Sequence, residues 1–539
     1  MATLPFELPA WKELATQAAK MERPENHLRL LLADPNRLTA FSLKDAGLFY
    51  DFSRQRLNSD ILTLLLDLAI ACQLSDRFRA MMNGAKLNTT EKRAALHTAT
   101  RSFQSTPLLV DGQDVLPTLK AVRSQIKAFS AAIHSAELTG STGKPFDTVV
   151  VIGIGGSYLG TEFVAQALGA YADKSIDLYF LSNVDIHDFG RLAKRVDPAT
   201  TLWIVISKSY TTAETMANAQ QAEAFVRSSG LDPADHFVTV TSKGSPGDDP
   251  AAAKLASFHM FDYIGGRYSV TSAVGGVPLS LYLGYDRFEH FLQGAEEMDQ
   301  HAAYAPADQN LPLVAALINV WNYYHLGYRV QGIIPYAAPL SKLAPHIQQL
   351  YMESNGKGVT AEGQIYSEPP GFVVFGEPGT NAQHSFFQLA HQGRPFPIDF
   401  IGVLIPQYEQ YKNQSRGVTN HQELWANLLS QPQALALGQA NDDKARCFSG
   451  NRPSSTILLQ DLTPANIGRL LAFYEARTVY EAFLLGINPF DQFGVELGKT
   501  IASKVRKTIA QKNETPEHAF QDQDPITRFY LETLFRGKF

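Results

Sequence analysis

Hydroxyl groups and one ammonium group are concentrated in a short stretch that directly follows an apolar run. The run reads WIVI at 203–206, and five hydroxyl-bearing residues and one lysine come next: Ser207, Lys208, Ser209, Tyr210, Thr211 and Thr212. Hydroxyls, a lysine and the backbone N–H groups of a following helix together suit the binding of a phosphate monoester. A helix cap needs only one or two such residues, so the density of donors favours a phosphate site over a cap.

A glycine-rich turn is a second candidate for anion binding. The segment VVVIGIGGSYLG at 149–160 ends a β-branched run in three glycines and Ser157. It is not a dinucleotide fingerprint, because Tyr158 takes the third glycine position, and no GK[ST] follows to make a P-loop. Glycines let the backbone approach a small ligand closely. The two stretches together predict a small phosphorylated metabolite as ligand, with a sugar phosphate as the simplest choice.

Two titratable residues are candidates for proton transfer. Glu353 lies in YMESNGKG (351–358), where a helix is expected to end with Gly356 in the left-handed conformation. His384 lies in GEPGTNAQHSFFQLAHQG (376–393), which places it in the first turn of a helix without the HExxH spacing of zinc ligands. A histidine can exchange a proton near pH 7. Each residue also has a structural interpretation, as a surface glutamate at a helix end or a buried core histidine.

Two cations occupy positions from which they could act on a bound anion. Arg267 follows a glycine pair in DYIGGRYSV (262–270), where a guanidinium would stabilise a developing oxyanion or simply pair with an acid. Lys499 ends the segment DQFGVELGK, which also contains Gln492, and it is equally suited to a solvated helix face.

The elements that must position these residues alternate between strands and helices. The strand-like runs are VVVI, DLYFL, LWIVI, FVTVT and SFHMF, followed later by VQGIIP, FVVF, IDFIGVLI and STILL. Helix-like segments lie between them, so an α/β fold with two doubly wound parallel sheets is predicted. In such sheets ligands bind at the carboxyl ends of the strands, which is where both donor-rich stretches lie.

The predicted boundaries divide the chain into five parts. WKELATQAAKM, SDILTLLLDLAIAC and TEKRAALHTATR indicate helices near the N-terminus, and no strand is evident there. The C-terminal ITRFYLETLF indicates an amphipathic helix. The parts are an N-terminal helical extension (1–114), a first α/β domain (115–285), a helical linker (286–309), a second α/β domain (310–506) and a C-terminal helical tail (507–539).

Composition excludes several classes of function. The net charge is −6 and no long Lys/Arg run occurs, so neither nucleic acid nor a membrane is an expected partner. Cys72 and Cys447 form no CxxC pair, which argues against a zinc cluster or a disulfide framework. The N-terminus lacks a signal-peptide pattern, and ILTLLLDLAIAC is too short to span a bilayer. A cytoplasmic protein that uses neither metal nor cofactor is expected.

Six motifs, in their order along the chain, resemble the successive signatures of the phosphoglucose isomerase family. They are GIGGSYLG, SKSYTTAET, DYIGGRYSVTSAVG, MESNGKG, GTNAQHSFFQLAHQG and NPFDQFGVELGK. The similarity extends from about residue 81 to Lys499 and so covers most of the chain. The resemblance implies two sugar-isomerase (SIS) domains, a homodimer with active sites at the subunit boundary, and interconversion of glucose 6-phosphate and fructose 6-phosphate.

The resemblance also implies roles for individual residues. Glu353 matches the base that moves a proton between C1 and C2, His384 the ring-opening residue supplied by the neighbouring subunit, and Lys499 its ring-opening partner. Arg267 matches the group that stabilises the enediolate. The implied substrate-binding residues are Gly156, Ser157, Ser207, Lys208, Ser209, Thr212, Gly266, Gln349 and Gln492.

Rival functions remain at this point. A non-catalytic sugar-phosphate sensor would keep the 207–212 stretch but would not need Glu353, His384 or Lys499, all of which are present. An isomerase that acts on mannose 6-phosphate would carry the same motifs, because that substrate differs at one hydroxyl. A secreted signalling role would be secondary, since no signal peptide is evident.

Overall fold

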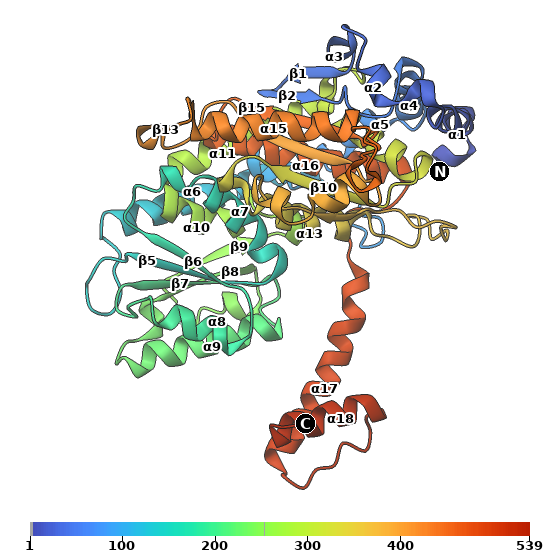
Figure 1. Ribbon diagram of the computed structural model, residues 1–539. Helices are drawn as coiled ribbons and strands as arrows, with labels where there is room; N and C mark the ends of the chain where they lie inside the picture. Colours follow the sequence, from blue (N-terminus) through green and yellow to red (C-terminus); the bar gives the residue numbers. More distant parts are fainter. Residues whose placement is uncertain (1–3, 253) are drawn as a thin grey trace. The chain divides into compact units, whose positions relative to one another are not determined.

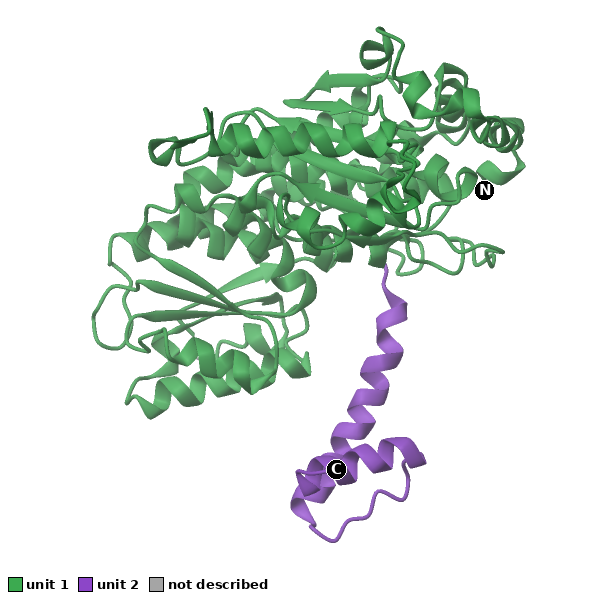
Figure 2. Cartoon of the chain, in the orientation of Figure 1, with its two compact units in different colours: residues 1–490 green, residues 491–539 purple. Residues whose placement is uncertain are grey.

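The computed structural model describes residues 4–252 and 254–539. The chain divides after Phe490 into two compact units (Figure 2). The larger unit contains both predicted sheets, and the smaller one contains α17 (Glu496–Glu514) and α18 (Pro525–Arg536). A helical C-terminal tail is therefore confirmed, but its predicted start at 507 falls inside α17, because the polar residues there continue a helix instead of ending a domain.

The first sheet has five strands, all parallel (Figure 1). Their order is β6-β5-β7-β8-β9, with the bounds β5 (Thr148–Ile152), β6 (Asp177–Leu181), β7 (Thr201–Ile206), β8 (Phe237–Ser242) and β9 (Ala256–Met260). Every residue of β5 and β7 is buried. Burial on both faces explains why these strands read as continuous apolar runs, and all five strands coincide with predicted ones.

Helices cover both faces of this sheet. Successive residues of a strand face opposite sides, so Val149 and Ile204 join the main core, whereas Val150 and Trp203 join a second cluster. The helices on the two sides are α6 (Leu116–His134), α7 (Leu159–Ala167) and α10 (Ala273–Leu283) over the main core, and α8 (Ile186–Ala193) and α9 (Ala213–Ser228) over the second cluster (Figure 1). The predicted doubly wound arrangement is confirmed for this sheet.

The second sheet has six strands and is mixed. Its order is β1-β2-β15-β12-β10-β11, with the bounds β1 (Ser42–Asp45), β2 (Leu48–Asp51), β10 (Val330–Pro335), β11 (Val373–Phe375), β12 (Ile398–Val403) and β15 (Ser454–Leu459). The last four strands are parallel and coincide with predicted runs, whereas β2 pairs antiparallel with β15. Helices α12 (Leu311–Val320), α13 (Leu343–Asn355), α14 (Phe387–Gln392), α15 (Asn420–Leu437) and α16 (Pro464–Leu485) accompany this sheet.

Strands β1 and β2 correct the expectation that the N-terminal extension contains no strand. They form a hairpin whose two turn residues, Ala46 and Gly47, both have positive φ (41° and 73°), as tight hairpin turns require. Each strand has only four residues, too few to produce a clear alternation in the sequence. Pairing with β15, some four hundred residues later, is what stabilises the hairpin.

The stretch predicted as a linker (286–309) consists mostly of a core helix. Helix α11 (Tyr285–Tyr304) packs along α16 with close backbone contact. A Cβ on Gly294 would stand 1.9 Å from the carbonyl oxygen of Ala465, and one on Gly468 would stand 2.0 Å from that of Phe291. Only glycine fits at these two positions. The two sheets lie in one compact unit.

An ionic cluster is buried between the N-terminal segment, α11 and α16. Arg101 donates hydrogen bonds from Nε and Nη2 to Asp299 at 2.6 and 2.7 Å and from Nη1 to Glu475 at 2.5 Å. All three side chains are at most 2% exposed. The helix predicted over TEKRAALHTATR is wrong except for its last turn, Thr98–Arg101, because the preceding backbone forms a bridge and Arg101 is recruited to this cluster.

The cluster predicts a pH dependence of stability. Burial raises the pKa of Glu475 to about 7, against the opposing charge of Arg101. An unfolded chain releases this proton near pH 4.3, so between about pH 4.3 and 7 the folded state holds one proton more and stability falls as pH rises. We expect Glu475→Gln to remove a penalty of roughly 3 kcal/mol at pH 8 and of only about 1 kcal/mol at pH 5.

Thermal unfolding of both proteins at pH 5, 6.5 and 8 measures this effect. The amide oxygen of the variant can still accept from Arg101, and Asp299 remains as its counter-ion. The melting temperature of the variant should exceed that of the wild type increasingly toward pH 8. An equal difference at all three pH values would show that Glu475 does not titrate in this range.

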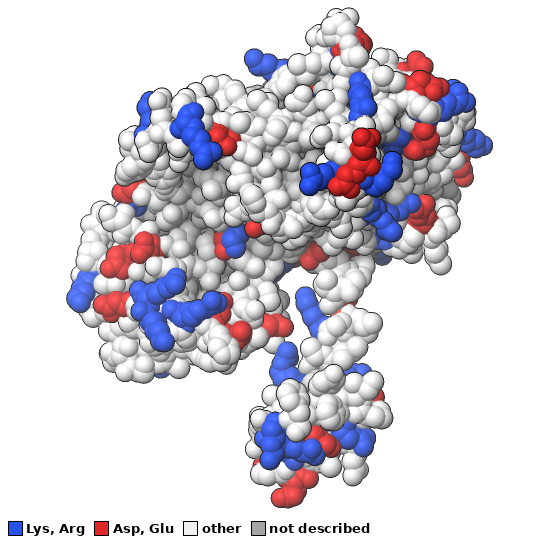
Figure 3. Space-filling view, in the orientation of Figure 1, with Lys and Arg blue, Asp and Glu red and all other residues white. Residues whose placement is uncertain are grey.

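In the described part of the chain, no helix is long and apolar enough to cross a membrane. On the face seen in Figure 3, acidic and basic side chains are interspersed, and no broad area of that face carries a single sign of charge.

Candidate active site

The two donor-rich stretches lie at neighbouring strand ends of the first sheet. The chain passes from β5 to β6 on one side and returns to β7 on the other side of β5, so the strand order reverses between β5 and β7. Ligands of open parallel sheets bind at such a reversal, beyond the carboxyl ends of the strands. The glycine turn with η4 (Gly155–Ser157) follows β5, and Ser207 follows β7. The predicted phosphate site thus lies where the topology favours a ligand.

Hydroxyls of the 207–212 stretch bond within the stretch and do not cap the helix that follows. Ser207 is buried and its Oγ accepts the N–H of Tyr210 at 3.1 Å, while the hydroxyls of Ser209 and Thr211 lie 2.7 Å apart. Thr212 immediately precedes α9, yet its side chain makes no capping hydrogen bond. The interpretation as a helix cap is therefore disfavoured, and the first N–H groups of α9 have no side-chain cap.

Tyr210 holds this stretch in shape. Its φ of +53° lies in the left-handed region, which is costly for a bulky residue. Its ring lies so close to Gly247 that a Cβ there would stand 2.3 Å from a ring carbon. The carbonyl oxygen of Lys208 also accepts from the Ser242 N–H at 3.0 Å and the Thr241 hydroxyl at 3.3 Å. The backbone that carries the donors is thus preorganised.

We expect Gly247→Ala to weaken phosphate binding about tenfold, because the new methyl group must displace the Tyr210 ring and overpacking costs about 1–3 kcal/mol. Calorimetric titration with inorganic phosphate measures the change. Gly190→Ala is the matched control, since a Cβ at Gly190 in α8 meets no atom within 4 Å. Unchanged affinity in Gly247→Ala would show that Tyr210 does not support the stretch.

Lys208 connects the stretch to the loop that precedes Arg267. Its Nζ lies 3.2 Å from the carbonyl oxygen of Asp262 and 3.3 Å from the carboxylate of the same residue. Burial lowers the pKa of Lys208, while the charge of Asp262 acts in the opposite direction. The Asp262 carboxylate is 78% exposed, so a phosphate can compete with it for the ammonium group.

The glycine turn after β5 touches the same loop. A Cβ on Gly156 would lie 2.3 Å from the carbonyl carbon of Gly266, so only glycine fits there. The Ser269 hydroxyl bridges the two segments, 2.6 Å from the oxygen of Gly266 and 3.3 Å from that of Gly156. This contact brings the turn with Ser157 beside η8 (Gly266–Tyr268), which carries Arg267.

Glu353 and Arg267 form the centre of the candidate site. Nη1 of Arg267 lies 3.4 Å from Oε2 of Glu353, and Gln349 Nε2 lies 3.3 Å from Oε1. Gln349 is one turn before Glu353 on α13 and so shares its face. A Cβ on Gly155 would stand 3.1 Å from Gln349 Nε2, which joins this group to the glycine turn. The Glu353 side chain is 28% exposed, whereas that of Arg267 is fully buried.

The end of α13 is correctly predicted, but the role of Gly356 is not. The helix ends at Asn355, and Gly356 has φ −76° instead of a left-handed value. A Cβ at Gly356 would stand 2.4 Å from the Met352 carbonyl oxygen, so lack of space explains this glycine. Lys357 donates to the carbonyl oxygen of Glu353 at 2.6 Å and satisfies this end of the helix.

Two acceptors that hold Arg267 escaped the sequence analysis. They are the Ser354 hydroxyl, 2.7 Å from Nε, and the Pro489 carbonyl oxygen, 2.5 Å from Nη2. In the sequence, only the position of Ser354 next to Glu353 indicates that Ser354 belongs to the site. Nothing in the sequence indicates the second.

Three further predicted site residues are exposed. His384 is exposed and ends η11 (Asn381–His384), ahead of α14, instead of lying in the first turn of an α-helix. Gln492 and Lys499 are exposed and belong to the smaller unit. Their predicted roles therefore stay predictions. Among residues 4–252 and 254–539, no three His, Cys, Asp or Glu side chains are grouped so as to hold a metal ion.

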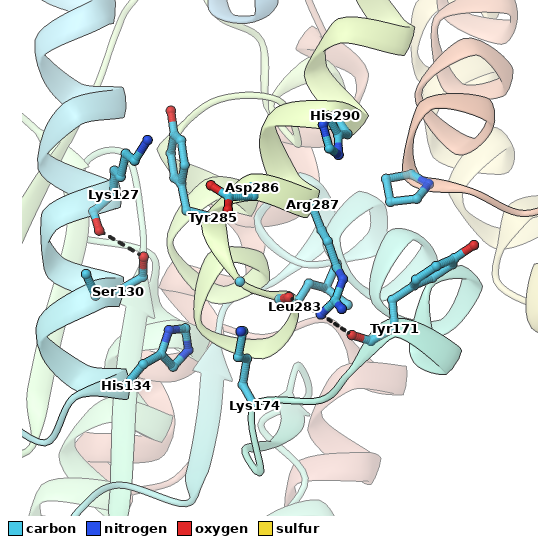
Figure 4. A pocket seen from close by; sticks show the side chains of 13 residues that line it. Lys127, Ser130, His134, Tyr171, Lys174, Leu283, Tyr285, Asp286, Arg287 and His290 are labelled. Carbon is cyan, nitrogen blue, oxygen red and sulfur yellow. Dashed lines mark hydrogen bonds between the residues drawn. The ribbon is translucent and has the colours of Figure 1, made fainter.

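A cavity of about 540 Å³ lies elsewhere, beside the start of α11 (Figure 4). Lys127, His134 and Lys174 line it, but none of the predicted site residues does. Its cations are largely neutralised by acids. Arg287 contacts both carboxylate oxygens of Asp173 at 2.6 Å, Lys174 lies 3.7 Å from Asp173, and Asp286 also lines the cavity. The predicted chemistry therefore belongs to the Glu353 group and not to this cavity.

Comparisons with known proteins agree with this geometry. The family model described as Phosphoglucose isomerase matches residues 51–525. A protein named glucose-6-phosphate isomerase in Desulfosudis oleivorans is 63% identical over 98% of this chain and 97% of that protein. A cytosolic glucose-6-phosphate isomerase of Spinacia oleracea is 43% identical over 94% of this chain and 92% of that protein. The crystal structure of a glucose-6-phosphate isomerase from Chlamydia trachomatis matches with a TM-score of 0.89 at 35% identity, over 99% of this chain and 100% of that one. The chain therefore belongs to the phosphoglucose isomerase family.

Proposed function

We propose that this protein interconverts D-glucose 6-phosphate and D-fructose 6-phosphate through ring opening and a cis-enediolate. The observation that carries the proposal is the pair formed by Glu353 and Arg267, next to a preorganised hydroxyl stretch at the reversal of the first sheet. A carboxylate, a buried guanidinium and a phosphate site together supply the base, the charge stabilisation and the anchor that the reaction needs.

The phosphate anchors the substrate away from the reacting carbons. It binds the hydroxyls of the 207–212 stretch, Lys208 and the backbone of the Gly156 turn, with Ser157 as a further donor. The binding energy holds the flexible open chain in one position. Gln349 lies between the glycine turn and Glu353 and lines the sugar; Gly266 and Gln492 complete the proposed lining.

Proton transfer takes place at the other end of the substrate, around the ring oxygen, C1 and C2. Ring opening needs a proton at the ring oxygen and loss of one from the C1 hydroxyl, tasks that we assign to His384 and Lys499. Glu353 then removes the proton from C2 of the aldose and returns it to C1. Arg267 stabilises the negative oxygens of the enediolate, so the residues supply acid, base and charge without a metal or cofactor.

We also propose a homodimer with shared active sites. His384 is exposed, as a residue offered to a neighbouring subunit must be. Helix α17 has 19 residues and none is buried. The exposed large apolar side chains of α17 and α18 are Leu497, Ile501, Ile526, Phe529, Tyr530, Leu534 and Phe535. Exposed apolar side chains in this number are a feature of interaction sites.

The cytoplasm is the proposed location. The relatives in Spinacia oleracea and Arabidopsis thaliana bear the description cytosolic.

The proposal is tested by incubating the protein with fructose 6-phosphate in deuterated water. Formation of glucose 6-phosphate is followed with a coupled dehydrogenase, and its C2 position is examined for deuterium by NMR. We expect turnover with label at C2. Binding without turnover or exchange would identify a sugar-phosphate sensor instead, and faster turnover of mannose 6-phosphate would identify the other isomerase.

A further inference from the structure

Two nitrogen atoms of the Arg267 guanidinium are held by groups other than Glu353. Its side chain is fully buried, and Nε and Nη2 donate to Ser354 Oγ at 2.7 Å and to the Pro489 carbonyl at 2.5 Å. Nη1 lies 3.4 Å from Glu353, which is a longer and weaker contact. Because the guanidinium is planar and rigid, fixing Nε and Nη2 also fixes the direction in which Nη1 points.

Ser354 is the next residue after Glu353 on α13. Successive side chains of an α-helix point about 100° apart. Glu353 accordingly reaches the partly exposed site, whereas Ser354 is fully buried beneath it. A single helix therefore presents both the carboxylate and the anchor of the cation that faces it. Because Glu353 and Ser354 are adjacent on α13, the rigid helix fixes the distance between the Glu353 carboxylate and the arginine that Ser354 holds.

The Ser354 hydroxyl has a second partner. Tyr268, which follows Arg267 in the chain, places its hydroxyl 2.9 Å from Ser354 Oγ. Tyr268 is buried, and burial raises its pKa to about 12, so its hydroxyl stays protonated. The serine oxygen has two acceptor sites and can take hydrogen bonds from both neighbours.

We propose that Ser354 is a positioning residue that aims Nη1 of Arg267 at the oxygens of the enediolate. This inference rests on the proposed isomerase function. Ser354 touches no substrate atom; it acts through Arg267. Its loss should therefore slow the enediolate step and leave phosphate binding and ring opening unchanged.

Two variants test the proposal. Ser354→Ala removes the acceptor. Ser354→Cys keeps the shape of the side chain, with a slightly larger atom, but replaces a strong acceptor by a weak one; it covers the case in which the alanine variant does not fold. We expect kcat to fall about 10- to 100-fold in each, because a small misplacement of a catalytic group costs this much. KM should stay within about twofold, since the phosphate donors are untouched.

The rate of ring opening serves as an internal standard, because the proposal predicts that the Ser354 variants change isomerisation alone. The rate at which the fructose 6-phosphate anomers interconvert, measured by magnetisation exchange NMR, should equal that of the wild type in both variants. Ser280→Ala is the matched control, because Ser280 is also a fully buried serine but lies on α10, away from the helix that carries Glu353; it should retain most of kcat.

Several results would overturn the assignment. Full kcat in Ser354→Cys, or a parallel loss of ring opening and isomerisation, would show that Ser354 supports the fold and does not orient the Arg267 side chain. A wild-type protein that does not isomerise at all would instead refute the proposed function, so the two failures are distinguishable.

Discussion

Replacing Glu353 with glutamine should reduce isomerisation about 10²- to 10⁴-fold, the range that a positioned general base contributes. The amide cannot accept the C2 proton, although it keeps the shape of the side chain and its contact with Arg267. Deuterium incorporation at C2 should fall by the same factor as turnover, because one group performs both. Affinity for inorganic phosphate should not change, since the Glu353 carboxylate contacts Arg267 and Gln349, which lie outside the 207–212 stretch.

The control for this variant is Glu362→Gln, which removes an exposed carboxylate from the loop after α13. It should leave both rates at the wild-type level. If Glu353→Gln isomerised normally, another base would have to act on C2, and the proposed mechanism would be wrong. If it stopped turnover but still exchanged the C1 proton of fructose 6-phosphate with solvent, Glu353 would serve a later step.

The parallel strands were accessible from sequence because burial on both faces leaves a strong signal. Runs such as VVVI and WIVI are apolar at every position, and they became β5 and β7. The hairpin of β1 and β2 carries no such signal, since its strands have four residues each and depend on β15. The core position of α11 was missed for a related reason: it is determined by packing against α16, not by the composition of α11 itself.

The residues of the candidate site also differ in how far they could be predicted from the sequence. The 207–212 stretch and the glycine turn are local motifs, so their residues could be named before any coordinates. The support of Arg267 is not local, because its acceptors lie 87 and 222 residues away in the chain. Only the fold brings α13, η8 and the segment before the smaller unit together. Sequence motifs therefore predicted which groups take part, while the residues that orient them required the structure.

Co-expression of an His384→Ala chain with a Glu353→Gln chain should restore activity that neither variant has alone. If each active site takes Glu353 from one subunit and His384 from the other, a mixed dimer contains one site with both residues intact and one site with neither. Random assembly makes half of the dimers mixed, so about one quarter of wild-type activity should return. Each variant alone should be reduced about 10²- to 10⁴-fold.

Separating the mixed dimer through two different affinity tags sharpens the measurement, because the purified species should then have about half of wild-type activity per dimer. Two defective sites would result if each subunit used its own Glu353 and His384, and activity would stay at the level of the single variants. That outcome would refute the assignment of the exposed His384 to the partner's active site. The exposed apolar side chains of α17 and α18 would then be the sole support for a dimer. Recovery, in contrast, would show that the acid His384 and the base Glu353 of one active site come from two different chains, so that they meet only when two chains associate.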